Sequence, residues 1–216
     1  MRFQPITPPS LFKKFFFGSL TALLLLLSAC GDYPTPALQS NATILAFGDS
    51  LTAGYGVKTS QSYPAQLQKQ LSQKVINAGI SGETTNQGKA RFSQTLEKYQ
   101  PDLVILTEGG NDFLKKIPKQ QTYENLLWMV ETAKAKDISV LLVGVPTTKL
   151  FSSSHDLYQQ LSDATQTPLE DDILPSLMFK PSMKSDYVHF NQQGYAAMAE
   201  AVYQKLVAIG AVSKIK

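Results

Sequence analysis

The hydrophobic positions of this chain fall into short apolar runs separated by amphipathic stretches. Four runs have the length and composition of buried strands: 43–47, 75–77, 102–107 and 138–145. Helical periodicity covers 62–72, 85–98, 122–136 and a terminal helix from Asn191, and a further helix is expected near 156–165, where the periodicity is poor. Near-continuous apolar strands that alternate with helices are typical of a parallel sheet covered on both faces. The pattern predicts an α/β fold, a three-layer α/β/α sandwich with a mainly parallel sheet of about five strands.

Two details of this assignment depend on single residues or short segments. The fifth strand is expected within 167–179, where the periodicity is poor. Thr122 is the candidate N-cap of the helix over 122–136, because a threonine hydroxyl can accept a hydrogen bond from the first free backbone N–H groups.

The N-terminus carries the pattern of an export signal. Arg2, Lys13 and Lys14 are followed by thirteen uncharged residues over 15–27. As a helix this run is about 20 Å long, which is short of the roughly 30 Å hydrocarbon core of a bilayer. We therefore predict a cleaved signal over 1–29 rather than a transmembrane helix.

The residues after the apolar run are Leu-Ser-Ala-Cys-Gly, 27–31, which resemble the bacterial lipobox. This resemblance implies that Cys30 is lipidated and becomes the first residue of the mature chain; an ordinarily cleaved secreted protein is the alternative. Residues 31–42 then form a flexible tether to a domain over 43–216. The expected location is the bacterial envelope, facing the periplasm, and Gly31 favours the outer membrane because it is not the Asp that retains some lipoproteins at the inner one.

Charge and cysteine content exclude several functions once the signal is removed. The chain of 216 residues has a formal net charge of +3, but residues 1–29 hold three of its 20 basic residues and no acid. The mature chain is formally neutral, which gives no support to nucleic-acid binding. A single cysteine excludes a disulfide framework, and neither zinc-ligand spacing nor a phosphate-binding loop occurs. No cofactor or metal is expected.

Polar residues follow three of the expected strands. The sequences are GDSLTAGYG at 48–56, AGISGETT at 78–85 and EGGND at 108–112, and a fourth polar group, 186–189, precedes the terminal helix. Ligands bind at the carboxyl ends of strands in parallel sheets. Each sequence alone is also typical of caps and turns.

Together and in this order, the four blocks resemble the SGNH, or GDSL-type, hydrolases, and most of all the branch of small bacterial thioesterases, arylesterases and lysophospholipases. The resemblance extends over about 43–208. The family's name residues fall on Ser50, Gly82, Asn111 and His189, and Asp186 completes a triad. The resemblance implies a flavodoxin-like fold and a serine hydrolase without a cofactor.

The residue types agree with these roles. A serine hydroxyl needs a base to become a nucleophile, and of the two histidines, His155 lies in a polar stretch without a partner. His189 lies three residues after Asp186, so the carboxylate can reach its Nδ1 within one turn. The family usually has Pro where Phe190 follows the histidine. The alternative role of Asp186 is the N-cap of the terminal helix.

The same resemblance implies an oxyanion hole. Its donors are the backbone N–H groups of Ser50 and Gly82 and the side-chain amide of Asn111. Glycine at position 82 leaves no Cβ between the chain and the reacting centre. The alternatives are a helix N-cap for Ser50, where Asp49 competes, and an ordinary turn residue for Asn111.

The sequence thus predicts a lipid-anchored envelope esterase that hydrolyses acyl esters or thioesters of small molecules or lipids. A first alternative is an O-acetyl esterase for envelope carbohydrate, which needs a shallow polar cleft; a second is a non-catalytic lipoprotein that binds acyl chains. The apolar residues of 55–63 and 173–183 line an acyl channel or pack in the core. The acidic run 170–172 is a cation site or a helix start.

Overall fold

The computed structural model describes Met1 and residues 33–146 and 154–214. Its sheet has five strands in the order β2-β1-β3-β4-β5, and every neighbouring pair is parallel. The strands are β1 (Thr43–Gly48), β2 (Lys74–Gly79), β3 (Leu103–Thr107), β4 (Ser139–Val143) and β5 (Leu169–Glu170). The predicted α/β/α sandwich with five parallel strands is confirmed, and the fifth strand lies within the segment 167–179.

Helices connect these strands. The longer ones are α3 (Thr85–Tyr99), α5 (Lys119–Lys134), α6 (Asp156–Thr165) and α8 (Gln192–Ala208). The shorter ones are α1 (Ser50–Ala53), α2 (Tyr63–Leu67), α4 (Gly110–Leu114) and α7 (Ile173–Met178), with 3-10 turns η1 (Thr59–Gln61), η2 (Gln68–Gln70) and η3 (Pro181–Met183). The helix expected over 62–72 is therefore divided into α2 and η2.

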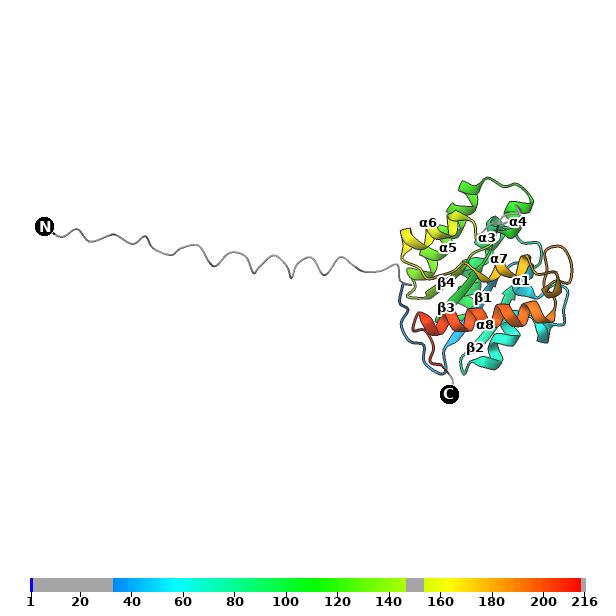
Figure 1. The fold of residues 1–216 in the computed structure, drawn as a ribbon, viewed down its shortest axis with the longest axis horizontal. Coiled ribbons are helices and arrows are strands. Elements are labelled where there is room, and N and C mark those ends of the chain that lie inside the picture. Colours follow the sequence, from blue (N-terminus) through cyan, green and yellow to red (C-terminus); the bar gives the residue numbers. More distant parts are fainter. Residues whose placement is uncertain (2–32, 147–153, 215–216) are drawn as a thin grey trace. The chain divides into compact units, whose positions relative to one another are not determined.

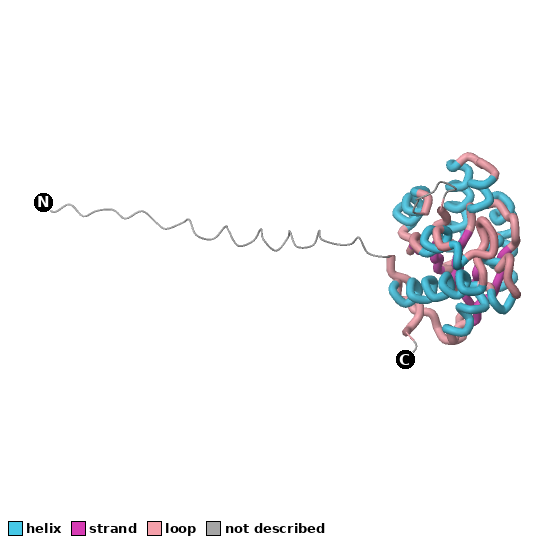
Figure 2. The backbone as a smooth tube through the Cα atoms, turned by 45° about the vertical axis from the view of Figure 1, so that its right-hand side comes forward, coloured by secondary structure: helices cyan, strands magenta, loops and turns pink. Residues whose placement is uncertain are grey.

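The helices form two layers around the sheet. α2 packs against α8 in one layer, and α3, α5 and α6 pack side by side in the other. α8 crosses in front of the sheet in Figure 1, and Figure 2 shows the strands surrounded by helices. Burial on both faces explains why all of β3 is apolar until Thr107: each of its side chains faces a helical layer and none faces solvent.

The segment before β1 packs on the domain. Thr35 donates a backbone hydrogen bond to Ile209 and Leu38 donates one to Ala211, both at 2.8 Å, and Ala42 is buried. Carbonyls just past the last turn of α8 have no helical partner and therefore accept bonds from this segment. This differs from the flexible tether expected over 31–42. Cys30 and the apolar run 15–27, which are expected to form the lipidation site and the signal, lie outside the described residues. No helix in the described part of the chain is long and apolar enough to span a membrane.

Two helix starts can be compared with the sequence-based expectation. α5 begins after Pro118, three residues before Thr122, because the Thr122 side chain is buried and donates to Asp112 at 3.2 Å instead of capping. α7 begins directly after the acidic run 170–172, where a helix start was one of the two expectations. The Glu170 carboxylate accepts from the backbone N–H groups of residues 172 and 173, so the acidic run begins this helix, and no cluster suited to a metal ion occurs among the described residues.

Candidate active site

Ser50 lies at the carboxyl end of β1, in the first turn of α1. Asp49 caps this helix, since its Oδ1 accepts from the Leu51 N–H at 3.0 Å. A Cβ at Gly48 would approach the Thr107 carbonyl oxygen to 2.3 Å, so only glycine fits where the strand meets the helix. Because Asp49 serves as the cap, the Ser50 hydroxyl is left for another partner.

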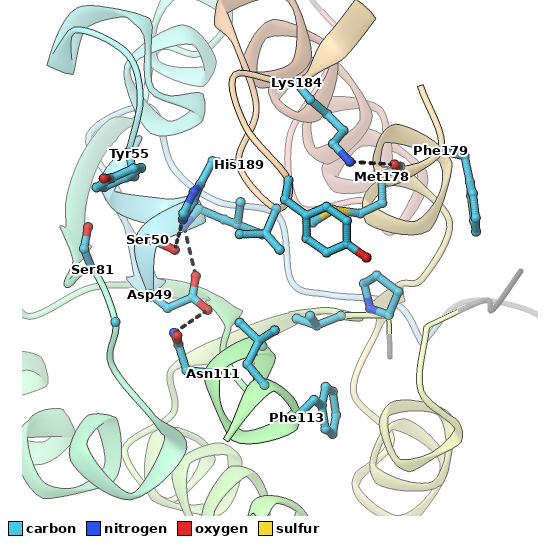
Figure 3. A pocket seen from close by; sticks show the side chains of 18 residues that line it. Asp49, Ser50, Tyr55, Ser81, Asn111, Phe113, Met178, Phe179, Lys184 and His189 are labelled. Carbon is cyan, nitrogen blue, oxygen red and sulfur yellow. Dashed lines mark hydrogen bonds between the residues drawn. The ribbon is translucent and has the colours of Figure 1, made fainter. Parts of the chain in front are cut away.

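That partner is His189. Its Nε2 lies 3.0 Å from Ser50 Oγ, and its Nδ1 lies 2.7 Å from Asp186 Oδ2 (Figure 3 shows the Ser50–His189 contact). The other Asp186 oxygen accepts from the backbone N–H groups of Val188 and His189, each at 2.9 Å. Asn191, not Asp186, caps α8 through the Gly194 N–H. The carboxylate of Asp186 is therefore committed to His189.

The electrostatics of Asp186 agree with this arrangement. Partial burial acts to raise the pKa of its carboxyl group, but hydrogen bonds from the His189 ring and from the backbone outweigh it and lower the pKa to about 2. Asp186 therefore carries a negative charge at neutral pH, next to the ring nitrogen that it holds.

The residues expected to form the oxyanion hole lie around the same hydroxyl. Asn111 is in the first turn of α4, after β3, and its Nδ2 donates to the Glu83 carbonyl at 2.9 Å. Gly82 follows β2 with a φ of +80°, and a Cβ there would meet nothing within 4 Å. Its positive φ thus favours glycine at this position. Ser50, Gly82 and Asn111 line one pocket.

This pocket has a volume of about 630 Å³ and extends from Ser50 along an apolar wall. Figure 3 shows Phe113 and Phe179 on its far side from Ser50. The wall includes residues of four segments: Phe113, Leu114, Val145, Pro146, Met178, Phe179, Tyr187 and Val188. Of the segments 55–63 and 173–183, Tyr55, Met178 and Phe179 line the pocket, whereas Tyr63, Leu174 and Leu177 are buried in the core.

Sequence reasoning missed a cluster of buried acids beneath the site. Asp49, Glu83, Glu108 and Asp112 are all buried within the loops that follow β1, β2 and β3. Burial, reinforced by the nearby Glu83 and Asp112, raises the pKa of Asp49 to about 7. Burial likewise raises the pKa of Glu108 well above its usual value. Turn-forming Asp and Glu give no sequence signal of burial, so only the converging loops reveal the cluster.

Neighbouring groups organise this cluster. Arg91 of α3 forms an ion pair with Glu83 and donates to the Ala78 carbonyl at 2.9 Å. Asp112 accepts from the Thr85 N–H at 2.9 Å and from its hydroxyl at 2.5 Å. Both acids thus fix the N-terminal half of α3 against the segments that hold Gly82 and Asn111.

Two aromatic contacts were also missed. The Tyr55 ring lies over His189 with centroids 4.3 Å apart, and the Tyr195 hydroxyl donates to the Tyr55 carbonyl at 3.0 Å. His155 is not a simple surface residue: its Nδ1 caps α6, and its ring stacks on Phe113. Burial and Lys119 lower the pKa of His155.

Comparison with known proteins identifies the family. Residues 46–197 match the profile of the GDSL-like lipase/acylhydrolase family. The chain belongs to this family. The matched range contains all four polar blocks, so the resemblance drawn from them is confirmed.

Individual relatives indicate the type of reaction. The chain is 34% identical over 182 residues to an arylesterase of Vibrio mimicus, which covers 79% of this chain and 91% of the relative. It is 31% identical over 172 residues to thioesterase 1/protease 1/lysophospholipase L1 of Escherichia coli K12, covering 76% and 83%. The crystal structure of TesA superimposes with a TM-score of 0.70 at 31% identity, covering 77% of this chain and 99% of that one. This member of the GDSL-like family is an ester-hydrolysing enzyme.

Proposed function

We propose that the enzyme hydrolyses acyl esters or thioesters through a triad of Ser50, His189 and Asp186, on a domain attached by Cys30 to the bacterial envelope. The observation that carries the catalytic part is the unbroken hydrogen-bond chain from Ser50 Oγ through the His189 ring to Asp186. Serine, base and orienting carboxylate in this geometry are the parts that nucleophilic acyl transfer needs.

The reaction proceeds in two halves. With the Nδ1 proton held by Asp186, His189 Nε2 takes the Ser50 proton as Oγ bonds to the substrate carbonyl carbon. The collapsing tetrahedral intermediate expels the alkoxide or thiolate, which receives that proton from Nε2. A water molecule then attacks the acyl-enzyme, giving its proton to His189, and the carboxylic acid leaves as Ser50 Oγ regains the proton.

Charge that develops on the carbonyl oxygen needs donors already in place. The Ser50 and Gly82 N–H groups and the Asn111 amide are assigned to this role. The Asn111 amide is held from behind by the Glu83 carbonyl, which orients Nδ2 without reorganisation during the reaction. The Gly82 N–H depends on the left-handed backbone at that residue.

The pocket favours an acyl chain or arene over an acetylated sugar. A sugar ester needs a polar cleft, whereas most of the side chains that continue from Ser50 are apolar. Residues 147–153, which follow Pro146 of the pocket wall, lie outside the described residues. A pocket of this size and character suits ligands that bury carbon.

The envelope part of the proposal depends on the N-terminus. We assign 1–29 to a signal, Cys30 to the lipid attachment point, the residues up to 42 to a connection and 43–216 to the catalytic domain. Supporting this assignment, an uncharacterized lipoprotein YqeF of Bacillus subtilis is 26% identical over 130 residues, which covers 53% of each chain. Mass spectrometry of the purified full chain for an acylated Cys30 tests the anchor.

The catalytic proposal predicts that Ser50→Ala lowers kcat for p-nitrophenyl butyrate by at least about 10³-fold while the fold is retained. A fluorophosphonate probe should modify the wild-type protein at Ser50 and leave the variant unmodified. p-Nitrophenyl esters from acetate to decanoate should give a rising kcat/KM beyond acetate.

Three outcomes oppose parts of this proposal. Full activity in Ser50→Ala refutes the nucleophile. Failure of the folded wild-type protein to react with the probe favours the non-catalytic, acyl-binding alternative. Activity restricted to acetyl esters favours the O-acetyl esterase.

A further inference from the structure

Lys184 places a positive charge in the wall of the pocket. Among the residues that line it, the formally charged types are Asp49, Lys184 and His189. Asp49 is buried beneath Ser50, and His189 is engaged with Asp186. Lys184 is therefore the permanent charge that a bound substrate meets in a pocket that is otherwise apolar.

The ammonium group of Lys184 is held in place without a carboxylate. Its Nζ donates to the Met178 carbonyl at 3.3 Å and lies 5.3 Å from the centroid of the Tyr187 ring. The ion pairs recorded in the described residues, Arg91 with Glu83 and His189 with Asp186, do not include it. An ammonium has three N–H donors and the carbonyl uses one, so two remain for a ligand.

Lys184 belongs to the same hairpin as His189. Lys184 pairs with Phe190 in an antiparallel bridge, and the Ser185 N–H donates to the His189 carbonyl at 3.0 Å. Figure 3 shows Lys184 on the wall that continues from His189 toward Met178 and Phe179. Since His189 is assigned to protonate the leaving group, that group lies beside this hairpin, with Lys184 farther along it.

We propose that Lys184, whose ammonium group lies over the Tyr187 ring, binds an anionic substituent on the leaving group of the ester or thioester. This inference rests on the proposed function of Ser50 and His189. The ligand chemistry is a phosphate, sulfonate or carboxylate separated from the reacting carbonyl by a spacer of several atoms. A phosphate of this kind occurs on a lysophospholipid headgroup and on a nucleotide-linked thiol.

A purely structural role for Lys184 makes a different prediction. The Met178 carbonyl lies at the end of α7, where a lysine ammonium stabilises the helix terminus. If that were all, removing the charge would lower stability and reduce activity on every substrate by the same factor. If Lys184 instead binds an anion, the loss of kcat/KM on removing its charge must depend on where the substrate carries its own charge.

The test compares three esters with the wild-type enzyme and Lys184→Gln. They are neutral p-nitrophenyl butyrate, 3-carboxy-4-nitrophenyl butyrate with an anionic leaving group, and the p-nitrophenyl monoester of glutaric acid with an anionic acyl group. We expect kcat/KM for the anionic leaving group to fall about five- to tenfold more than for the neutral ester, the size of a partly screened charge contact. This additional loss on the anionic ester should become smaller as the salt concentration is raised from about 0.05 M to about 0.5 M, because screening weakens the contact.

Two further variants separate this effect from general ones. Lys184→Arg keeps the charge and should retain most of the discrimination. Lys180→Gln removes the same charge from the exposed position next to Phe179, outside the pocket lining, and should leave the ratio of the anionic to the neutral ester unchanged.

Three results overturn the proposal. The first is an equal loss of kcat/KM on all three esters in Lys184→Gln. The second is a loss in that variant confined to the ester with the anionic acyl group. The third is the same selective loss for the anionic leaving group in Lys180→Gln. Turnover of the neutral ester by wild type but not by Ser50→Ala shows separately that the proposed function holds.

Two natural sources of phosphate are then compared as substrates: short-chain lysophosphatidylglycerol, below its micelle concentration, and butyryl-coenzyme A. A Lys184→Gln defect on one of them supports the subsite and assigns its source. A defect on neither contradicts the binding of phosphate.

Discussion

The side chain of Asp49 makes two contacts next to the proposed nucleophile. One carboxyl oxygen caps α1 through Leu51, and the other lies 3.4 Å from Asn111 Nδ2. Burial raises the pKa of this carboxyl group from 3.8 to about 7. At this scale, the residue before the serine links the helix that carries the nucleophile to the amide assigned to the oxyanion hole.

The raised pKa of Asp49 predicts a pH-dependent stability. Between about pH 4 and pH 7 the folded protein holds a proton here that the unfolded chain has lost, so the free energy of unfolding falls as the pH rises through this window. Asp49→Asn keeps the helix cap and removes the titration. Its stability relative to wild type should therefore rise with pH, by up to about 1.4 kcal/mol per pH unit.

Urea unfolding at pH 5, 6 and 7 measures this difference. The matched control is Asp137→Asn at an exposed position, for which parallel curves are expected. Parallel curves for Asp49→Asn would mean that Asp49 titrates alike in both states.

Helix α3 connects the ends of two neighbouring strands through one side chain. The Arg91 guanidinium donates to Ala78 of β2, approaches the Gly48 carbonyl of β1 at 3.5 Å and pairs with Glu83. Its planar face lies 3.8 Å from the centroid of the Phe47 ring. At the scale of elements, this helix positions the loop that carries Gly82.

Loss of Arg91 should affect stability and activity differently. Arg91→Met leaves Glu83 buried without its partner, which costs about 3–5 kcal/mol of stability. Adding Glu83→Gln removes the buried charge, so the double variant should regain much of that stability. Neither variant should recover wild-type kcat/KM, because the Ala78 and Glu83 contacts that hold the Gly82 loop are missing in both.

Thermal unfolding and p-nitrophenyl butyrate kinetics measure the two effects. Lys98→Met on the same helix serves as the control and should change neither. A double variant with wild-type activity would exclude a positioning role for Arg91.

At the scale of the whole molecule, the segment before β1 lies far from the candidate active site. The segment 35–42 binds beside the end of α8 and enters β1 at its first residue, whereas Ser50, Gly82 and Asn111 follow the last residues of β1, β2 and β3. In a parallel sheet the first and last residues of the strands lie at opposite ends of the strands. The length of β1, at ~3.3 Å per residue, separates the two ends by about 20 Å. The N-terminal segment can therefore stabilise the domain without contacting the site.

Two N-terminal truncations test this separation. A chain of residues 43–216 lacks three backbone hydrogen bonds to the rest of the domain and the packed Leu38 side chain, contacts worth about 3 kcal/mol together. Its Tm should be roughly 5–10 °C below that of a chain of residues 33–216. The kcat/KM values of the two should agree at 25 °C. Equal Tm values would restore the flexible-tether interpretation.

The local pattern of the sequence determined the sheet, most helices and the four polar blocks, because strand runs, helical periodicity and turn residues are encoded within a few neighbouring positions. It also identified Asp186 beside His189, since that contact lies within one turn. Thr122 shows the limit: its propensity favours a cap, but tertiary packing turns it inward toward Asp112.

Only the tertiary structure decided which side chains from remote parts of the sequence are in contact. His189 reaches Ser50 over 139 positions, Tyr55 covers the imidazole, and Lys184 lies in the wall of the apolar pocket. The buried acids are likewise visible only once three loops converge. These properties depend on burial and on distances between remote segments, and neither is a function of neighbouring residues. The sequence therefore specified the residues proposed for the reaction, while the fold set their distances, the pKa values of the buried acids and the lining of the pocket.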